Sequence, residues 1–410
     1  MEVFAYLIPY GLEWLNLIVR WLHVITGIAW IGASFYFVWL DNSIRPPAPG
    51  SDLAKKGVSG ELWAVHGGGF YNPQKYLLAP AELPKELHWF KWEAYSTWLS
   101  GFALLTIAYY FNAQAMMIDK AVADISSGQA VGIGIATLVI GWTVYDLLCR
   151  SKLAQYELWF GVTVFALIVG AAYVLTHLLS GRAAYIHVGA MIGTIMVANV
   201  LMLIIPGQRK MVEAMAAGKL PDPKHGLKAK QRSVHNNYFT LPVLFIMISN
   251  HYAMTYRNDH AWLVLALIMA AGVFIRHFFN LRHKGRVEWR YPALGVALLL
   301  AVAVAIAPKA PAPVAAVAAV DPAAQFKAVH AIIAQRCATC HSAQPTQPGF
   351  ATAPAGMMLD NETEIRQHAA QIYKQAIELK AMPIGNLTNM TEAERSELGA
   401  WLQQTMQGAK

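Results

Sequence analysis

The stretch Cys337-Ala338-Thr339-Cys340-His341 decides how the C-terminal part of this 410-residue chain folds. Its pattern, C-x-x-C-H, is the covalent attachment site of a c-type haem: two thiols add to the porphyrin vinyl groups, and the adjacent imidazole binds the iron. The alternative is a zinc half-site or a redox dithiol, but no second Cys/His pair stands nearby to complete a zinc shell. We therefore expect Cys337 and Cys340 to hold one haem c and His341 to be an axial iron ligand.

The residues around this motif have the composition of a small soluble domain, which we place at 323–410. A helix-forming run leads into Cys337. A second helix is predicted from Thr391, because Thr391 and Glu394 form the Thr-x-x-Glu pattern of a capping box. Two terminal helices that enclose one haem are the plan of a small class I-like cytochrome c domain.

Such a domain needs a sixth iron ligand or an open iron. Met382, followed by Pro383, comes about forty residues after the motif, in a predicted loop before the last helix. A thioether ligand there would raise the reduction potential, as in electron-carrying cytochromes. The competitors are Met357, Met358 and Met390, since a methionine in a small core often serves packing.

The rest of the chain has the composition of a membrane protein. Hydrophobic residues make up 56% of the sequence and charged residues only 14%. The net charge of +8 does not indicate nucleic-acid binding, because the basic residues lie in loops between apolar segments. Cys149 is the only cysteine outside the motif, which excludes a disulfide framework. The N-terminus lacks the features of a cleaved signal peptide.

Eight segments are apolar over the roughly 20 residues that cross a bilayer, and together they predict an all-α, polytopic helical bundle over 1–307. An Ala/Pro-rich segment at 308–322 reads as a linker to the cytochrome c domain. The predicted spans are 14–40, 93–111, 130–148, 156–180, 182–206, 235–256, 261–280 and 291–307.

Loop charges predict the orientation of this bundle. The loops after the odd-numbered spans carry 19 Lys and Arg residues, whereas the N-terminal segment and the other loops carry 3 when Arg182, at the edge of the fifth span, is included. The positive-inside rule therefore places both termini on the periplasmic side of a bacterial inner membrane. This agrees independently with the haem motif, since c-type haem is attached on that side.

The long loop at 41–92 contains a His-Gly-Gly-Gly run that begins at His66. No G-x-S-x-G nucleophile elbow accompanies it, which excludes acyl hydrolysis of the lipase type. The glycines either make a tight turn against the membrane face or help to bind a substrate, and both interpretations stay open.

Four histidines fall in the predicted outer half of the bundle, which is the half nearer the haem motif. Paired imidazoles on facing helices hold b-type haem in membrane bundles, so a haem b or a histidine-lined pocket is one interpretation. The other is that these histidines serve helix packing. The four residues are His23, His177, His187 and His251.

The whole chain resembles the membrane-bound bacterial urate oxidase (urate hydroxylase) family, in which a multi-span domain is fused to a C-terminal cytochrome c. The resemblance is carried by Gly27 to Phe37 (GIAWIGASFYF), by Glu61 to Tyr76, which includes WAVHGGGFYNPQKY, and by His88 to Tyr95 (HWFKWEAY).

This resemblance implies a function in purine catabolism. Urate and water would give 5-hydroxyisourate, with electrons leaving through haem c to a cytochrome c or terminal oxidase instead of forming peroxide. A urate site needs a cation for the anion and aromatic or amide groups for the purine. Our candidates are Arg20, His23, His66 and Lys75.

Two alternatives belong to other functional classes. The bundle could be an electron-transfer or oxidase-accessory subunit that relays electrons from quinol or a partner dehydrogenase to cytochrome c. It could also be a transporter with a tethered cytochrome, whose polar intramembrane residues line a pathway. Reduction of the haem by urate without added quinol distinguishes the enzyme from both.

Overall fold

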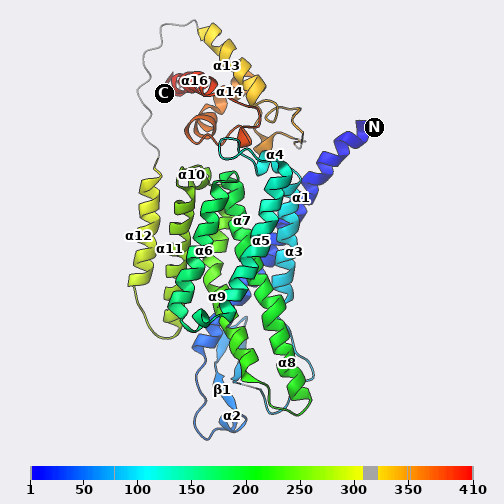
Figure 1. The fold of residues 1–410 in the computed structure, drawn as a ribbon, viewed down its shortest axis with the longest axis vertical. Coiled ribbons are helices and arrows are strands. Elements are labelled where there is room, and N and C mark those ends of the chain that lie inside the picture. Colours follow the sequence, from blue (N-terminus) through cyan, green and yellow to red (C-terminus); the bar gives the residue numbers. More distant parts are fainter. Residues whose placement is uncertain (1, 78, 308–321, 349, 351, 409–410) are drawn as a thin grey trace.

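The computed structural model describes residues 2–77, 79–307, 322–348, 350 and 352–408. The first 307 residues build an elongated helical bundle, and the C-terminal residues form a small helical domain over one end of it (Figure 1). A segment containing short strands lies at the opposite end (Figure 1). Most of the predicted linker, residues 308–321, lies outside the described residues.

The bundle is made of long helices that run roughly side by side, with shorter helices at their ends (Figure 1). They are α1 (Glu2–Ser43), α3 (Trp92–Leu105) continued by the π-helical η1 (Thr106–Tyr110), α4 (Ala113–Met116), α5 (Ser127–Arg150), η2 (Lys152–Gln155), α6 (Glu157–Thr176), α7 (Gly181–Ala198) continued by the π-helical η3 (Asn199–Ile204) and α8 (Ile205–Ala216), α9 (Pro223–Ser249), α10 (Ala253–Tyr256), α11 (Ala261–His283) and α12 (Arg290–Ala305).

Each predicted span overlaps a helix of this bundle, but the span at 235–256 extends past the end of α9 into α10. In the described part of the chain, five helices are apolar and long enough to cross a membrane: α1, α5, α6, the continuous α7–α8 and α11. Of the other three, α3 and α12 are shorter than 18 residues. The first half of α9 is rich in lysine and arginine, which lowers its hydropathy. The all-α prediction is confirmed.

The strands form two small antiparallel pairs in the loop between α1 and α3. Strand β1 (Val58–Glu61) pairs with β4 (Gln74–Tyr76), and β2 (Ala64–His66) pairs with β3 (Gly69–Tyr71). Gly67 and Gly68 make the turn between β2 and β3 with φ of 58° and 79°. Such backbone angles favour glycine and suit a two-residue hairpin turn. Helix α2 (Asp52–Lys55) precedes β1.

A buried polar network joins α5, η3 and α9. Arg232 Nη2 donates to Asp146 Oδ1 at 2.7 Å, and its Nη1 donates to Asn199 Oδ1 at 3.1 Å. The Asn199 amide in turn donates to Asn236 Oδ1 at 2.8 Å and to the Tyr145 hydroxyl at 3.1 Å. The Arg232 and Asp146 charges are thus buried together and compensate each other.

The C-terminal domain packs its helices around a separate apolar core that includes Leu398, Trp401 and Leu402. The predicted capping box is present, because Glu394 N donates to Thr391 Oγ1 at 3.2 Å while Thr391 N donates to Glu394 Oε2 at 2.7 Å. The elements are α13 (Pro322–Arg336), η4 (Pro354–Gly356), α14 (Glu362–Gln367), α15 (Ala369–Ile372), η5 (Tyr373–Glu378), η6 (Ile384–Asn386) and α16 (Glu392–Gly408).

We predict that Asp146→Asn destabilises the bundle by about 3–5 kcal/mol, because it leaves the buried Arg232 guanidinium without a counter-charge. Thermal unfolding of the nanodisc-embedded protein measures this loss. The exposed pair of Lys55 and Asp52 is the control, and Asp52→Asn should change stability by less than about 1 kcal/mol. Equal stabilities of the two variants would contradict the prediction.

Candidate functional site: the haem motif and its contact with the bundle

The C-x-x-C-H motif directly follows α13 and keeps a helical turn. Cys340 N donates to Cys337 O at 3.1 Å, and His341 N donates to the same oxygen at 2.9 Å. His341 Nδ1 lies 3.1 Å from the carbonyl oxygen of Met357. With Nδ1–H donating to this carbonyl, the Nε2 lone pair of His341 is left for a metal, which is the usual arrangement of a metal-bound histidine.

The two thiols are partly shielded from water, Cys337 more than Cys340. Cys337 packs against the core of the domain, and burial raises the pKa of its thiol to about 12. Burial also raises the pKa of Cys340. Next to the motif, Ser342 Oγ is buried without a hydrogen-bond partner among the described residues. This side of the domain therefore has a polar atom left for a bound group to satisfy.

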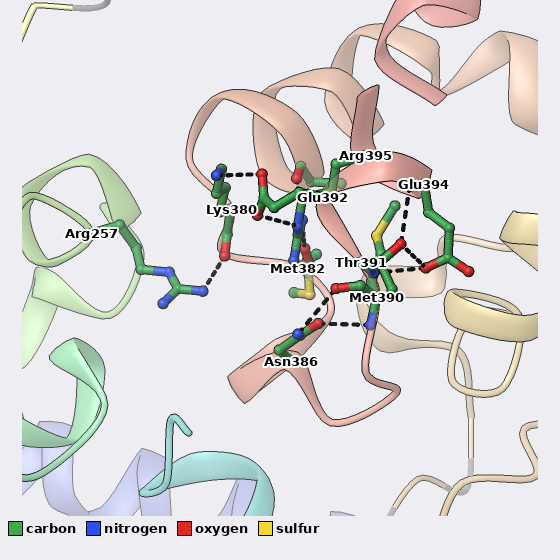
Figure 2. Close-up of polar contacts among 10 residues, drawn as sticks. Arg257, Lys380, Met382, Asn386, Met390, Thr391, Glu392, Glu394 and Arg395 are labelled. Atoms are coloured by element: carbon green, nitrogen blue, oxygen red, sulfur yellow. Dashed lines mark hydrogen bonds and ion pairs between the residues drawn. The ribbon is translucent and has the colours of Figure 1, made fainter. Parts of the chain in front are cut away.

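Met382 lies in the loop before α16 and packs against the same core as Cys337. Its backbone is held on both sides: Met382 N donates to Gln375 O at 3.0 Å, and Arg395 Nη1 donates to Met382 O at 2.8 Å. Figure 2 shows this loop with Arg395 above it. The buried Arg395 side chain thus positions the methionine.

The competing methionines have other places. Met357 supplies the carbonyl that accepts from His341, so it lies on the histidine side of the site. Met358 is exposed. Met390 is buried, and the Asn386 side chain bonds both its N–H and its carbonyl (Figure 2). These contacts support Met382 as the ligand that faces His341, and we propose it in that role.

The Met382 loop also contacts the membrane bundle. Arg257, which follows α10, donates to Asp119 Oδ2 at 2.7 Å and also to the backbone carbonyl of Lys380 (Figure 2). Gly385 in η6 has φ of 55°, and a Cβ there would lie 2.7 Å from the carbonyl oxygen of Ile118. The domain therefore rests on the bundle through the loop that carries the proposed iron ligand.

The histidines predicted for a haem b lie in different surroundings. His187 is fully buried, but its Nδ1 lies 2.8 Å from the Ala183 carbonyl and its Nε2 3.3 Å from the Tyr110 hydroxyl. His177 and His251 are exposed. Each ring nitrogen of His187 thus has a neighbouring oxygen, and a haem b held by these histidines stays a prediction. The described residues contain no group of three or more His, Cys, Asp or Glu side chains placed to bind a metal.

The proposed substrate residues on α1 make local contacts. His23 packs against α3, with Nδ1 3.0 Å from the Thr97 carbonyl and 3.2 Å from Ser100 Oγ. Arg20 is exposed and donates to Asn16 Oδ1 within the same helix. Arg20 and His23 thus form hydrogen bonds with different neighbours and not with each other.

The candidates in the long loop are also apart from the bundle interior. His66 is exposed at the β2–β3 turn. Lys75 on β4 forms an ion pair with Asp41, which Lys230 also approaches at 3.5 Å. Burial, and then the nearby Lys230, lower the pKa of Lys75. Lys75, which we predicted as a residue that binds the anionic substrate, is thus paired with the Asp41 carboxylate.

Comparison with protein-family models gives two matches: urate oxidase N-terminal over residues 9–307, and cytochrome c over residues 326–406. The chain belongs to the urate oxidase N-terminal family. The match confirms the resemblance drawn from the sequence, and the fused cytochrome c domain implies a haem c. No curated protein and no solved structure gives a significant match.

Within the urate oxidase domain, most buried amides bind helices together. Asn199 and Asn236 belong to the Arg232 network, and Asn250 accepts from the Tyr109 hydroxyl at 2.8 Å. Asn237 is different, because its amide nitrogen is buried without a partner among the described residues, close to Arg276. The sequence signal for Arg276 is a charged residue inside the predicted span 261–280.

We predict that Met382→Leu lowers the midpoint potential of the haem and removes the sulfur-to-iron absorption band of the oxidised protein, because the thioether ligand is lost. Potentiometric titration with optical detection measures both. Met358→Leu, at an exposed position, is the control and should leave both unchanged. A lost band in Met390→Leu with an intact band in Met382→Leu would move the ligand to Met390.

The acid stability of the cytochrome domain should depend on Glu394. The Thr391 N–H, together with Arg336, lowers the pKa of Glu394 below its usual 4.5. A lowered carboxyl pKa stabilises the fold above the unfolded pKa, and this stabilisation is lost as the pH falls through the lowered value. Glu394→Gln should therefore reduce the melting temperature at pH 7 but flatten its decline below about pH 5. Glu397→Gln, at an exposed position, is the control; identical pH profiles for wild type and Glu394→Gln would refute this.

Proposed function

We propose that this protein oxidises urate to 5-hydroxyisourate and passes the electrons through its cytochrome c domain to a cytochrome c or terminal oxidase, as a step of purine catabolism. The observation that carries the proposal is that a urate oxidase domain and a cytochrome c domain share one chain, with the Met382 loop resting on the bundle. A redox domain in contact with the oxidising domain removes the need for oxygen as electron acceptor.

The reaction balances without oxygen. Urate monoanion and water give neutral 5-hydroxyisourate, one proton and two electrons. The new bond joins C5 of the purine to the water oxygen, and the proton leaves to solvent. A c-type haem, when bound, accepts and releases one electron at a time. The cytochrome c domain must therefore be oxidised twice by its external acceptor for each urate.

Residues of this chain would bind the haem and position its domain for the transfer of electrons. Cys337, Cys340, His341 and Met382 would hold the haem, and two of them, Cys337 and Met382, pack against the apolar core of the domain. Arg257 positions the Met382 loop against the bundle through the Lys380 carbonyl. Asp119 orients the Arg257 guanidinium and compensates its charge.

We also propose that the protein is a multi-pass protein of the bacterial inner membrane with the cytochrome domain in the periplasm. Among the described residues, five helices are long and apolar enough to span a bilayer. The basic loops lie at the strand-containing end of the bundle, away from the cytochrome domain (Figure 1). A periplasmic cytochrome domain could meet soluble or membrane-bound carriers directly.

We predict that urate added to membranes containing the protein reduces the haem c band without added quinol and without stoichiometric peroxide. The Cys337→Ser/Cys340→Ser variant should lose urate turnover with oxygen-linked acceptors, because the electron outlet is missing. Optical spectra and a peroxide assay measure these outcomes. If quinol reduces the band and urate does not, the protein is a relay subunit and the urate oxidation proposed here is wrong.

A further inference from the structure

Two arginines are buried in the bundle, and they differ in how their charges are compensated. Arg232 has the Asp146 carboxylate at 2.7 Å. Arg276 on α11 is equally buried, at 4% exposure, yet no described carboxylate forms an ion pair with it. Its Nε donates to Asn237 Oδ1 at 3.0 Å, while its Nη2 is buried with no partner among the described residues.

A buried guanidinium does not become neutral by losing its proton, because its pKa exceeds about 12 in proteins. An unpaired charge in a low-dielectric interior is costly, and a buried arginine is therefore normally found with an anion. Arg276 has an N–H group pointing at no acceptor. The observation indicates an anionic ligand that the chain itself does not supply.

The groups around Arg276 extend the site beyond a single cation. Asn237, on α9, is 1% exposed, and its Nδ2 donor has no partner among the described residues. Asn280 donates its Nδ2 to Asn237 Oδ1 at 2.9 Å, which leaves its buried Oδ1 acceptor unpaired in the same part of the chain. The guanidinium carbon of Arg276 lies 4.1 Å from the ring centroid of Phe35 on α1.

A cation, an amide donor, an amide acceptor and an aromatic ring are thus brought together from three helices. We propose that Arg276, Asn237, Asn280 and Phe35 form the binding site for the urate monoanion, an assignment that rests on the function proposed above. Urate is a planar anion whose edges alternate carbonyl oxygens with N–H groups. The guanidinium and the Asn237 amide can donate to its oxygens, and Asn280 Oδ1 can accept from a ring N–H.

The helix that carries Phe35 is less enclosed than the two helices that carry the polar groups of this site. Between Tyr10 and Ser43, α1 contains no buried residue, whereas Arg276 and Asn237 lie on helices with several. Phe35 and Arg276 both lie near the C-terminal ends of their helices, toward the strand-containing end of the bundle and away from the cytochrome domain (Figure 1). Urate would enter from that end.

Binding can be measured apart from oxidation. The full-length holoprotein in nanodiscs is reduced with ascorbate, so that bound urate finds no electron acceptor, and radiolabelled urate is titrated by equilibrium dialysis. We expect Arg276→Gln to weaken binding about a hundredfold, as for a lost charge-assisted hydrogen-bonding partner. Arg282→Gln removes an exposed arginine from the same helix and should bind like wild type.

Asn237→Asp tests the idea in a variant expected to fold well. It places a carboxylate where Arg276 Nε already donates, and so reproduces the compensation that Asp146 gives Arg232. An internal anion should raise the melting temperature and exclude urate. If Asn237 only holds helices together, the Asn237→Asp variant should bind urate as well as the wild type does, although its Arg276 is better paired.

The outcomes separate this site from the proposed function. Loss of urate binding in Arg276→Gln and Asn237→Asp, with Arg282→Gln unaffected, supports the site. Wild-type binding by Asn237→Asp together with a raised melting temperature overturns it, and leaves urate oxidation standing if urate still reduces the haem. If wild-type protein neither binds urate nor is reduced by it, the function itself fails.

Discussion

The organisation of the membrane bundle depends on one constraint: a charge inside a low-dielectric interior needs a counter-charge or enough hydrogen bonds to replace its water shell. Arg232 meets it within the chain, through Asp146 and Asn199, and in doing so fixes α5, η3 and α9 to one another. Arg276 does not meet it within the described residues. The same residue type is thus structural in one place and open to a ligand in another.

The sequence predicted the parts of the fold that have local causes. Apolar runs located the long helices, the Thr391 capping box located the start of the last one, and C-x-x-C-H located the haem motif. The paired strands escaped prediction, because their three or four residues are too short for a period and their register depends on the Gly67-Gly68 turn.

The candidate site was harder, because it depends on which helices meet. Sequence shows that His187 lies in an apolar span, but not that Ala183 and Tyr110 already occupy its ring nitrogens. Arg276, Asn237 and Phe35 are far apart along the chain, and only the packing of α1, α9 and α11 brings them together. The available signal was the cost of a charged residue within a span.

The contact at Gly385 limits which substitutions the two domains can accept during evolution. A side chain there would run into the carbonyl oxygen of Ile118. The Met382 loop and the end of α4 are therefore complementary in shape, and a larger side chain on one side would need a compensating change on the other. A cytochrome c module with a larger residue at this position would be held away from this bundle. Fusion has thus made the cytochrome c domain a part whose surface is fitted to this bundle.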